Sequence, residues 1–294
     1  MAWRALALCL LAACGGRAQA LPAIADCDAA AHARVLVPSA SGITDARAAW
    51  LDARHLRWPG KAADARLSLH LAASDGAVAI GRALPRGGVT LALAPRAAPL
   101  PEALVQRWAW LGEGVTWAPA AEDDVAPSFG QDAVLVEWDA AGGVRDATRV
   151  QHAGALDAHY AAAAGLDDLG VRPAPQAAAF RLWAPTARAV TLCLYPGSTA
   201  PAQSATPLQR DATTGAWSAR LPGDLRGQYY TYLVDVFVPG LGQVRNRVTD
   251  PYAISLSANS ARAYIGDLDD PRLMPAGWAG GERGPALAQP TDAV

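Results

Sequence analysis

The stretch Phe180-Arg-Leu-Trp-Ala-Pro-Thr-Ala-Arg-Ala-Val-Thr-Leu-Cys-Leu-Tyr195 alternates hydrophobic with other residues at a period of two on either side of an Ala-Pro-Thr-Ala bend. The hydrophobic residues of one face are Phe180, Leu182, Ala184, Val190, Leu192 and Leu194. A turn at 211–215 leads to a predicted strand at 216–221, and 228–238 predicts the longest strand. Short strands at this spacing, with no helical period between them, indicate an all-β fold of the sandwich type.

Six sequence words in this half resemble known families. Four of them, in order, resemble carbohydrate-binding module family 48: they occupy 180–187, 215–218, 227–232 and 248–253. Ser-Leu-Ser-Ala-Asn-Ser (255–260) and Asp-Leu-Asp-Asp-Pro-Arg-Leu-Met-Pro-Ala-Gly-Trp (267–278) resemble pullulanase-type α-1,6-glucosidases of glycoside hydrolase family 13. The resemblance implies an immunoglobulin-like sandwich over 176–265, placed ahead of a catalytic barrel.

Residues 45–172 predict a second β-rich domain. Strands are expected in 49–60, 67–71, 78–80, 89–93 and 134–138, with a hairpin turn at 139–143. Short helices are expected at 100–111, which carries Trp108 and Trp110, and in the alanine-rich run before Gly165. Trp-Leu-Asp (50–52), Trp-Pro-Gly (58–60) and the run 151–164 resemble the domain upstream of family 48 modules in pullulanases and plant limit dextrinases. We therefore expect two consecutive β-sandwiches with short helices, joined by a hinge at Pro173–Pro175.

Composition limits the partners. The chain has 294 residues and a formal net charge of −2, so no nucleic-acid footprint is expected. It is long enough for two domains, each with its own core. Ten tryptophans stand against three phenylalanines. Indole faces suit sugar rings, but they also fill the cores of β-sandwiches.

Residues 1–20 have the features of an export signal. Arg4 is followed by a short apolar run (5–13) and by a small-x-small cleavage pattern at Ala18-Gln19-Ala20. A second interpretation stays open, because Leu11-Ala-Ala-Cys14 resembles a lipobox in which Cys14 is lipidated. Either one predicts a secreted, periplasmic or lipid-anchored protein, with 21–44 as a linker; cytoplasmic retention is the alternative. A lipid on Cys14 is the one membrane attachment we expect.

Export would leave Cys27 and Cys193 as the cysteines of the folded domains. They either pair as a disulfide in an oxidising compartment or remain two free thiols. The five histidines are scattered, without the spacing of a zinc site, and no cofactor motif is present. We expect neither a metal nor a cofactor.

No catalytic residues are predicted within the chain. Retaining glycosidases need two carboxylates about 5 Å apart, and the resemblance implies that these lie in the barrel, which takes roughly 250 residues. We expect 266–294 to be a linker toward that barrel and the chain to be a truncated fragment without it. The neighbouring pairs Asp123–Asp124, Asp167–Asp168 and Asp269–Asp270 are expected to be solvated loop charges.

Sugar contact is the remaining function of the residues themselves. The resemblance implies a platform at the end of the second strand, where Tyr195 stands, and a second in the hairpin at 241–243, which holds Leu-Gly-Gln. The candidates for glycan binding are therefore Trp183, Tyr195 and Trp217. Each has a structural alternative: Trp183 against a neighbouring domain, Trp217 as a cap on the sandwich. Tyr230 and Tyr232 are expected in the core.

Three functions stay open at this point. The first is the non-catalytic N-terminal portion of a pullulanase-type debranching enzyme, with α-glucan and the parent barrel as partners. The second is an autonomous α-glucan-binding protein, and the third is a structural or adhesion sandwich unrelated to glucans. For the first we expect no release of reducing ends from pullulan and a tendency to self-associate.

Overall fold

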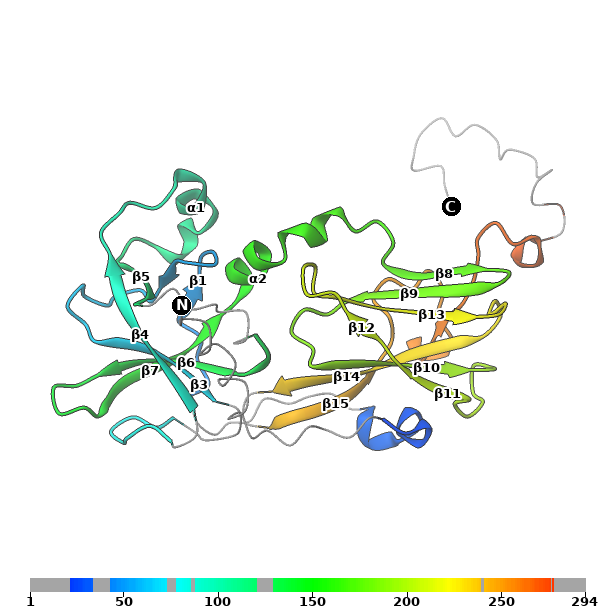
Figure 1. The fold of residues 1–294 in the computed structure, drawn as a ribbon, viewed down its shortest axis with the longest axis horizontal. Helices are drawn as coiled ribbons and strands as arrows, with labels where there is room; N and C mark the ends of the chain where they lie inside the picture. Colours follow the sequence, from blue (N-terminus) through cyan, green and yellow to red (C-terminus); the bar gives the residue numbers. More distant parts are fainter. Residues whose placement is uncertain are drawn as a thin grey trace, which may run out of the picture.

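The computed structural model describes residues 22–33, 43–72, 78–85, 88–120, 129–238, 241–275 and 277. Figure 1 shows two β-rich bodies side by side, with helix α2 in the region between them. Strands far outnumber helices in the described part, so the all-β prediction is confirmed. Among the described residues, no helix is both long and apolar enough to cross a membrane.

The first body is a closed barrel. Its strand order is β1-β2-β5-β4-β3-β6-β7, and a parallel pairing of β1 with β7 (Ala48 beside Val150) closes it. The elements are β1 (Ala48–Trp50), β2 (Leu56–Arg57), β3 (Leu67–Ala72), β4 (Gly88–Arg96), α1 (Glu102–Arg107), η3 (Ala109–Leu111), β5 (Thr116–Pro119), β6 (Asp132–Trp138), β7 (Val144–Gln151), α2 (Ala153–His159) and η5 (Ala161–Gly165).

The barrel corrects the expectation of a sandwich for this body. Inward and outward residues alternate along a strand in both architectures, so the sequence pattern is the same for either. The deciding contact joins β1 to β7, about a hundred residues later, which no local pattern encodes. Residues 78–80, expected as a strand, form a turn in which Val78 is buried.

Tryptophan fills the barrel interior. Trp50, Trp58 and Trp117 are at most 1% exposed and share one cluster with leucines of β2, β3 and β6. Helix α2 seals this core against β1, and the approach is so close that a Cβ at Gly154 would lie 2.3 Å from the carbonyl oxygen of Leu51. Glycine is therefore required at that position.

The second body consists of two antiparallel sheets facing each other across one core. One has the order β11-β10-β14-β15, with β16 also pairing with β14, and the other has the order β12-β13-β9-β8. The elements are β8 (Gly170–Ala174), β9 (Ala177–Trp183), β10 (Ala189–Tyr195), β11 (Ser204–Pro207), β12 (Gln209–Arg210), β13 (Ala216–Pro222), β14 (Tyr229–Val238), β15 (Gly242–Val248), η6 (Ala258–Ser260), β16 (Ala263–Tyr264) and η7 (Pro271–Leu273).

The alternation around the bend at 184–187 is confirmed by the core. Phe180, Leu182, Val190, Leu192 and Leu194 all lie in it and are at most 5% exposed. The expected hinge is different, because Pro173 lies inside β8, which pairs with β9. Proline fits there because β8 is the edge strand of its sheet.

The two bodies meet where Tyr160 stands between α2 and η5, and at β12. Arg210 donates a hydrogen bond of 2.6 Å from Nη2 to the hydroxyl of Tyr160, whose ring lies in the core of the first body. Gly215, at φ +70°, leaves room for Tyr160 and Pro185, since an added Cβ would lie 2.8–3.0 Å from them. This junction therefore depends on both bodies being folded.

Candidate functional site

Tyr195, the expected sugar platform at the end of β10, is closed off. Its side chain is 1% exposed, its hydroxyl donates to the carbonyl oxygen of Cys27 at 2.8 Å, and the Arg262 guanidinium lies 3.6 Å from its ring centroid. Burial raises the pKa of the Tyr195 hydroxyl. A ring covered in this way offers no face to a glycan, so the structure does not support this residue as a platform.

The two candidate tryptophans are held by hydrogen bonds from their indole nitrogens. Trp217 is 6% exposed within the core of the second body and donates to the carbonyl oxygen of Ala184 at 3.0 Å. Trp183 is half-buried and donates to the carbonyl oxygen of Thr214 at 2.8 Å. Of the three residues suggested by the sequence, only Trp183 retains partial exposure.

The N-terminal segment 22–33 explains the burial of Tyr195. The sequence assigns it to a linker, but it forms η1 (Ile24–Cys27) and η2 (Ala30–His32) and packs on the outer face of the β10–β14–β15 sheet, as the blue segment of Figure 1 shows. Cys27 and Cys193 form a disulfide, with a Cα–Cα distance of 5.7 Å. Arg247 donates to the Cys27 carbonyl oxygen at 2.6 Å. We call this segment, with its disulfide, the clasp.

A buried ion pair supports the clasp from below. Arg245 donates to both carboxylate oxygens of Asp235, at 2.8 and 2.9 Å, and reaches Asp26 of the clasp at 3.2 Å. The hydrogen bond to Asp235 raises the pKa of Arg245. This fork geometry keeps the pair charged within the sheet and fixes the position of η1.

The loop after β15 is fixed by a carboxylate between two tyrosines. Asp250 Oδ2 accepts hydrogen bonds from Tyr230 at 2.7 Å and from Tyr232 at 3.5 Å. Both rings are fully buried, which confirms their prediction as core. Burial raises the pKa of Asp250, and it also raises those of both tyrosines. These hydrogen bonds anchor the Val-Thr-Asp-Pro-Tyr segment to the core. Among the described residues, no second carboxylate is hydrogen-bonded to either tyrosine.

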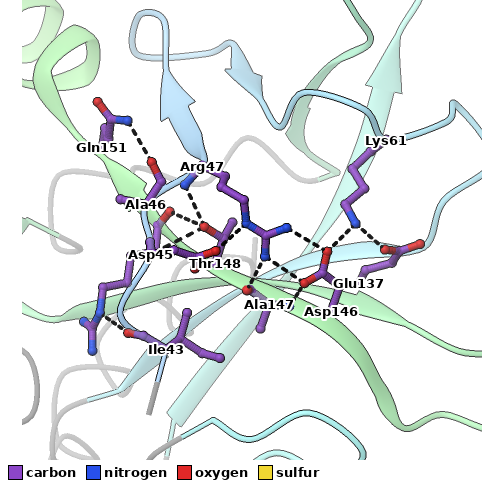
Figure 2. Close-up of polar contacts among 11 residues, drawn as sticks. Ile43, Asp45, Ala46, Arg47, Lys61, Glu137, Asp146, Ala147, Thr148 and Gln151 are labelled. Carbon is purple, nitrogen blue, oxygen red and sulfur yellow. Dashed lines mark hydrogen bonds and ion pairs between the residues drawn. The ribbon is translucent and has the colours of Figure 1, made fainter. Parts of the chain in front are cut away.

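A charged network joins the segment before β1 to β6 and β7 in the first body (Figure 2). Asp146 accepts from Arg47 at 2.7 and 3.1 Å and from Lys61 at 2.6 Å, while Lys61 also donates to Glu137 at 2.6 Å. Arg47, together with Lys61, lowers the pKa of Asp146 to about 2. The Lys61 ammonium lies 4.1 Å from the ring centroid of Trp58. Each charged group of this network contacts a group of opposite charge. The network therefore stabilises the packing of the strands, and we assign it no role in proton transfer.

The acidic pairs are not arranged for glycosidic chemistry. Asp168 pairs with Arg181 at 2.6 Å and Asp270 with Arg272 at 2.6 Å, while Asp167 is 93% exposed. Asp123–Asp124 lie outside the described residues. In the described part of the chain, no three His, Cys, Asp or Glu side chains gather as a metal site.

An exposed indole was missed by the sequence-based choice of candidates. Trp110 on η3 is 64% exposed, and its ring centroid lies 5.8 Å from that of Trp108. Beside Trp108 is a hollow of about 800 Å³, which Arg57 and Glu113 also line. A sequence signal was available: two tryptophans two positions apart in one helical turn point in different directions, so one of them can be exposed while the other is buried.

Comparison with known families decides what these two bodies are. Residues 45–158 match the pullulanase N2 domain, and residues 168–253 match carbohydrate-binding module 48, the isoamylase N-terminal domain. The chain contains a pullulanase N2 domain followed by a family 48 module. The barrel is thus the N2 domain, and the two-sheet body is the family 48 module.

Relatives that match both domains of the chain agree with this assignment. The chain is 33% identical to a pullulanase of Klebsiella pneumoniae over 244 residues, which is 82% of the chain and 22% of that enzyme. It is 29% identical to the chloroplastic pullulanase 1 of Arabidopsis thaliana over 182 residues, 61% of the chain and 18% of that protein. A crystal structure of the K. pneumoniae pullulanase complexed with maltotriose superposes with a TM-score of 0.72 at 32% identity, covering 81% of this chain and 22% of that one.

The N2 domain and family 48 module correspond to the non-catalytic N-terminal portion of a pullulanase-type enzyme, as the sequence predicts. The chain spans about a fifth of the length of the K. pneumoniae and A. thaliana pullulanases described above. The N2 match ends at residue 158, within α2, and the family 48 match begins at residue 168.

Proposed function

We propose that this chain is the scaffold portion of an exported starch- or glycogen-debranching enzyme of glycoside hydrolase family 13. In the full-length parent, that enzyme hydrolyses α-1,6-glucosidic bonds, and the N2 domain and family 48 module hold its barrel and accompany its glucan. The observation that carries the proposal is the order of the two domains, together with continuous homology over 82% of the chain.

The described residues support a scaffold role over a catalytic one. The buried carboxylates of the described residues are each committed: Asp235 to Arg245, Asp250 to two tyrosines, Asp270 to Arg272 and Glu137 to Lys61. Retaining glycosidases need two free carboxyl groups about 5 Å apart. We also propose that the two facing sheets of the family 48 module have the immunoglobulin-like topology expected from the sequence.

An apolar surface near the end of the described chain is the proposed seat of the parent barrel. Seven of the thirteen exposed large hydrophobic side chains of the described residues fall between 248 and 274. They are Val248, Tyr252, Ile254, Leu256, Leu268, Leu273 and Met274. Exposed apolar side chains that gather on one face mark an interaction surface, and this stretch overlaps the end of the family 48 match at residue 253.

Glucan association is part of the proposal, and its support comes from two sources. The family 48 module is a carbohydrate-binding module by family, and similar pullulanases have been solved as maltotriose complexes. In this chain Tyr195 and Trp217 are buried, so a contact by the module itself would rely on the partly exposed Trp183.

Export is proposed on the disulfide. Bonds such as Cys27–Cys193 persist in oxidising compartments and are rare in the cytoplasm. Residues 1–20 and Cys14, which carry the signal and lipobox patterns, lie outside the described residues. Secreted, periplasmic and lipid-anchored forms are all compatible with the bond, and mass spectrometry of the mature N-terminus distinguishes them.

A domain exchange tests the proposed function. The matching region of the K. pneumoniae pullulanase is replaced by residues 22–275 of this chain, which keep the clasp and its disulfide, and release of reducing ends from pullulan is measured. We expect a soluble fusion that hydrolyses pullulan, whereas the same enzyme without any replacement of the deleted region loses activity or solubility. The isolated chain is expected to release none.

Two outcomes would refute the proposal. Turnover of pullulan by the pure isolated chain would show a catalytic site that the scaffold role excludes. A folded fusion with no more activity than the deleted enzyme would show that these domains do not support a barrel.

A further inference from the structure

Trp110 is an exposed aromatic surface that is held rigidly. It is the one tryptophan among the described residues with a largely exposed side chain, at 64%. Its ring leans on Trp108, with an interplanar angle of 46°, and Trp108 is fixed by a 2.9 Å hydrogen bond from Nε1 to the carbonyl oxygen of Leu51. An indole left in water and braced from behind offers a preformed face to a flat ligand.

Next to Trp108 lies a hollow lined by Arg57, whose guanidinium has hydrogen-bond donors without a partner among the described residues. Its volume of about 800 Å³ falls within the roughly 300–1,000 Å³ typical of small-molecule sites. Arg57, 8% exposed, lines it and donates a 2.6 Å hydrogen bond from Nη1 to the carbonyl oxygen of Gly112. Its buried Nε has no hydrogen-bond partner among the described residues. Since a guanidinium carries five N–H donors, most of its capacity is left for acceptors on a ligand.

A second hollow adjoins the first through shared lining residues, and we call the two together the groove. A neighbouring hollow of about 490 Å³ shares Ala63 and Pro95 with the first and extends to Trp138. The indole nitrogen of Trp138 is satisfied by Ser68 at 2.7 Å, which fixes the orientation of its ring. A groove with tryptophans along its walls suits an extended chain of rings better than a single compact molecule.

The charges along the groove select a neutral ligand. Arg57 and Arg96 are accompanied by Glu113 in the first hollow, and Arg66 is accompanied by Asp64 in the second. Such a mixture of donors and acceptors suits hydroxyl groups, which both donate and accept, and it lacks the single-sign field that would concentrate an anion. Trp110 itself lines neither hollow, but its ring packs on Trp108, which lines the first one. We propose that this groove of the N2 domain binds a linear neutral oligosaccharide, with a sugar ring on Trp110 beside the first hollow and hydroxyls on Arg57; the choice of an α-glucan rests on the proposed function.

Calorimetry with matched variants tests the site. Maltopentaose and cellopentaose are titrated into the mature chain and into Trp110→Ala, Trp110→Phe, and Ile80→Ala. Ile80 is a control in the same domain, because its side chain is also largely exposed, at 60%, but is neither in the lining of the groove nor part of the Trp108–Trp110 pair. We expect maltopentaose binding to weaken at least fivefold in Trp110→Ala, to recover in part in Trp110→Phe, and to stay within twofold in Ile80→Ala. Arg57→Lys, checked for native circular dichroism, should weaken it as well.

Each contrary result overturns the assignment. No heat from maltopentaose at millimolar concentration excludes the site, and unchanged binding in Trp110→Ala places any glucan site elsewhere. Equal affinity for cellopentaose removes the α-glucan assignment. Because the domain-exchange assay depends on the barrel and not on Trp110, an active fusion combined with any of these results overturns the groove alone.

Discussion

The charged network of Figure 2 allows a prediction about stability in which burial is the variable. The pKa of Asp146 is held at about 2, below the ordinary aspartate value of 3.8, chiefly by its hydrogen bonds with Arg47 and by Lys61. The difference of about 1.8 units corresponds to roughly 2.4 kcal/mol in favour of the folded state. Since the Asp146 side chain is 22% exposed, screening by solvent reduces this to about 1–2 kcal/mol.

The substitution Asp146→Asn should therefore lower the free energy of unfolding of the N2 domain by about 1–2 kcal/mol at pH 7. A carboxylate with a depressed folded pKa stabilises above its unfolded pKa, and the contribution is lost as pH falls through the folded value. The difference between wild type and variant should thus be full above pH 5 and shrink between about pH 4 and pH 2.

Asp224 provides the matched control. Arg226 also lowers its pKa to about 2, but the pair lies at the surface of the family 48 module. Exposed pairs of this kind contribute little, so Asp224→Asn should leave stability almost unchanged. Urea unfolding followed by tryptophan fluorescence measures both. Equal losses in the two variants, or a loss for Asp146→Asn that persists unchanged at pH 2.5, would refute the reasoning from burial.

Three further predictions concern the family 48 module and its junction with the N2 domain. Replacing Cys27 and Cys193 by serine should lower the stability of the module by about 2–4 kcal/mol and make residues 22–33 sensitive to limited proteolysis; a protected segment would contradict the clasp. Because burial raises the pKa of Asp250, the folded state binds its proton more readily, so stability should fall as pH rises from 3.8 through the folded pKa; urea titrations should show this slope flattened in Asp250→Asn. Tyr160→Phe removes the acceptor of Arg210 and should cost about 1–2 kcal/mol, with the thermal transitions of the two domains moving apart in calorimetry.

Local sequence pattern was sufficient where neighbours in sequence decide the structure. The alternation in 180–195 specifies β9 and β10 and their buried face, and Tyr230 with Tyr232 follows the same rule in β14. Successive side chains of a strand point to opposite faces, so the inward side chains of these strands are determined by a period of two, whichever strand pairs with each. The family words then added the order of the two domains.

Contacts between distant segments escaped that reasoning. The burial of Tyr195 depends on Cys27, 168 positions earlier, and barrel closure depends on β1 meeting β7. Neither partner carries a local mark of the other. Trp110 illustrates a different failure, because its helical turn was predicted but the exposed side of that turn was not identified from the pattern around Trp108.

Glucan could bind in the groove of the N2 domain or at Tyr195 of the family 48 module, and the clasp makes these two models distinguishable. The clasp covers Tyr195, where the sequence resemblance implies a platform, whereas Trp110 is on η3, directly after α1 in the N2 domain. Figure 1 shows α1 on the body opposite the clasp. If the groove is the binding site, reducing the disulfide should leave the affinity for maltopentaose unchanged. The Trp110→Ala substitution should still weaken binding in the reduced protein. If the module were the site and the clasp its cover, reduction would free the Tyr195 ring and raise the affinity in wild type and Trp110→Ala alike. The response of one measured affinity to reduction therefore assigns the contact to one domain or the other.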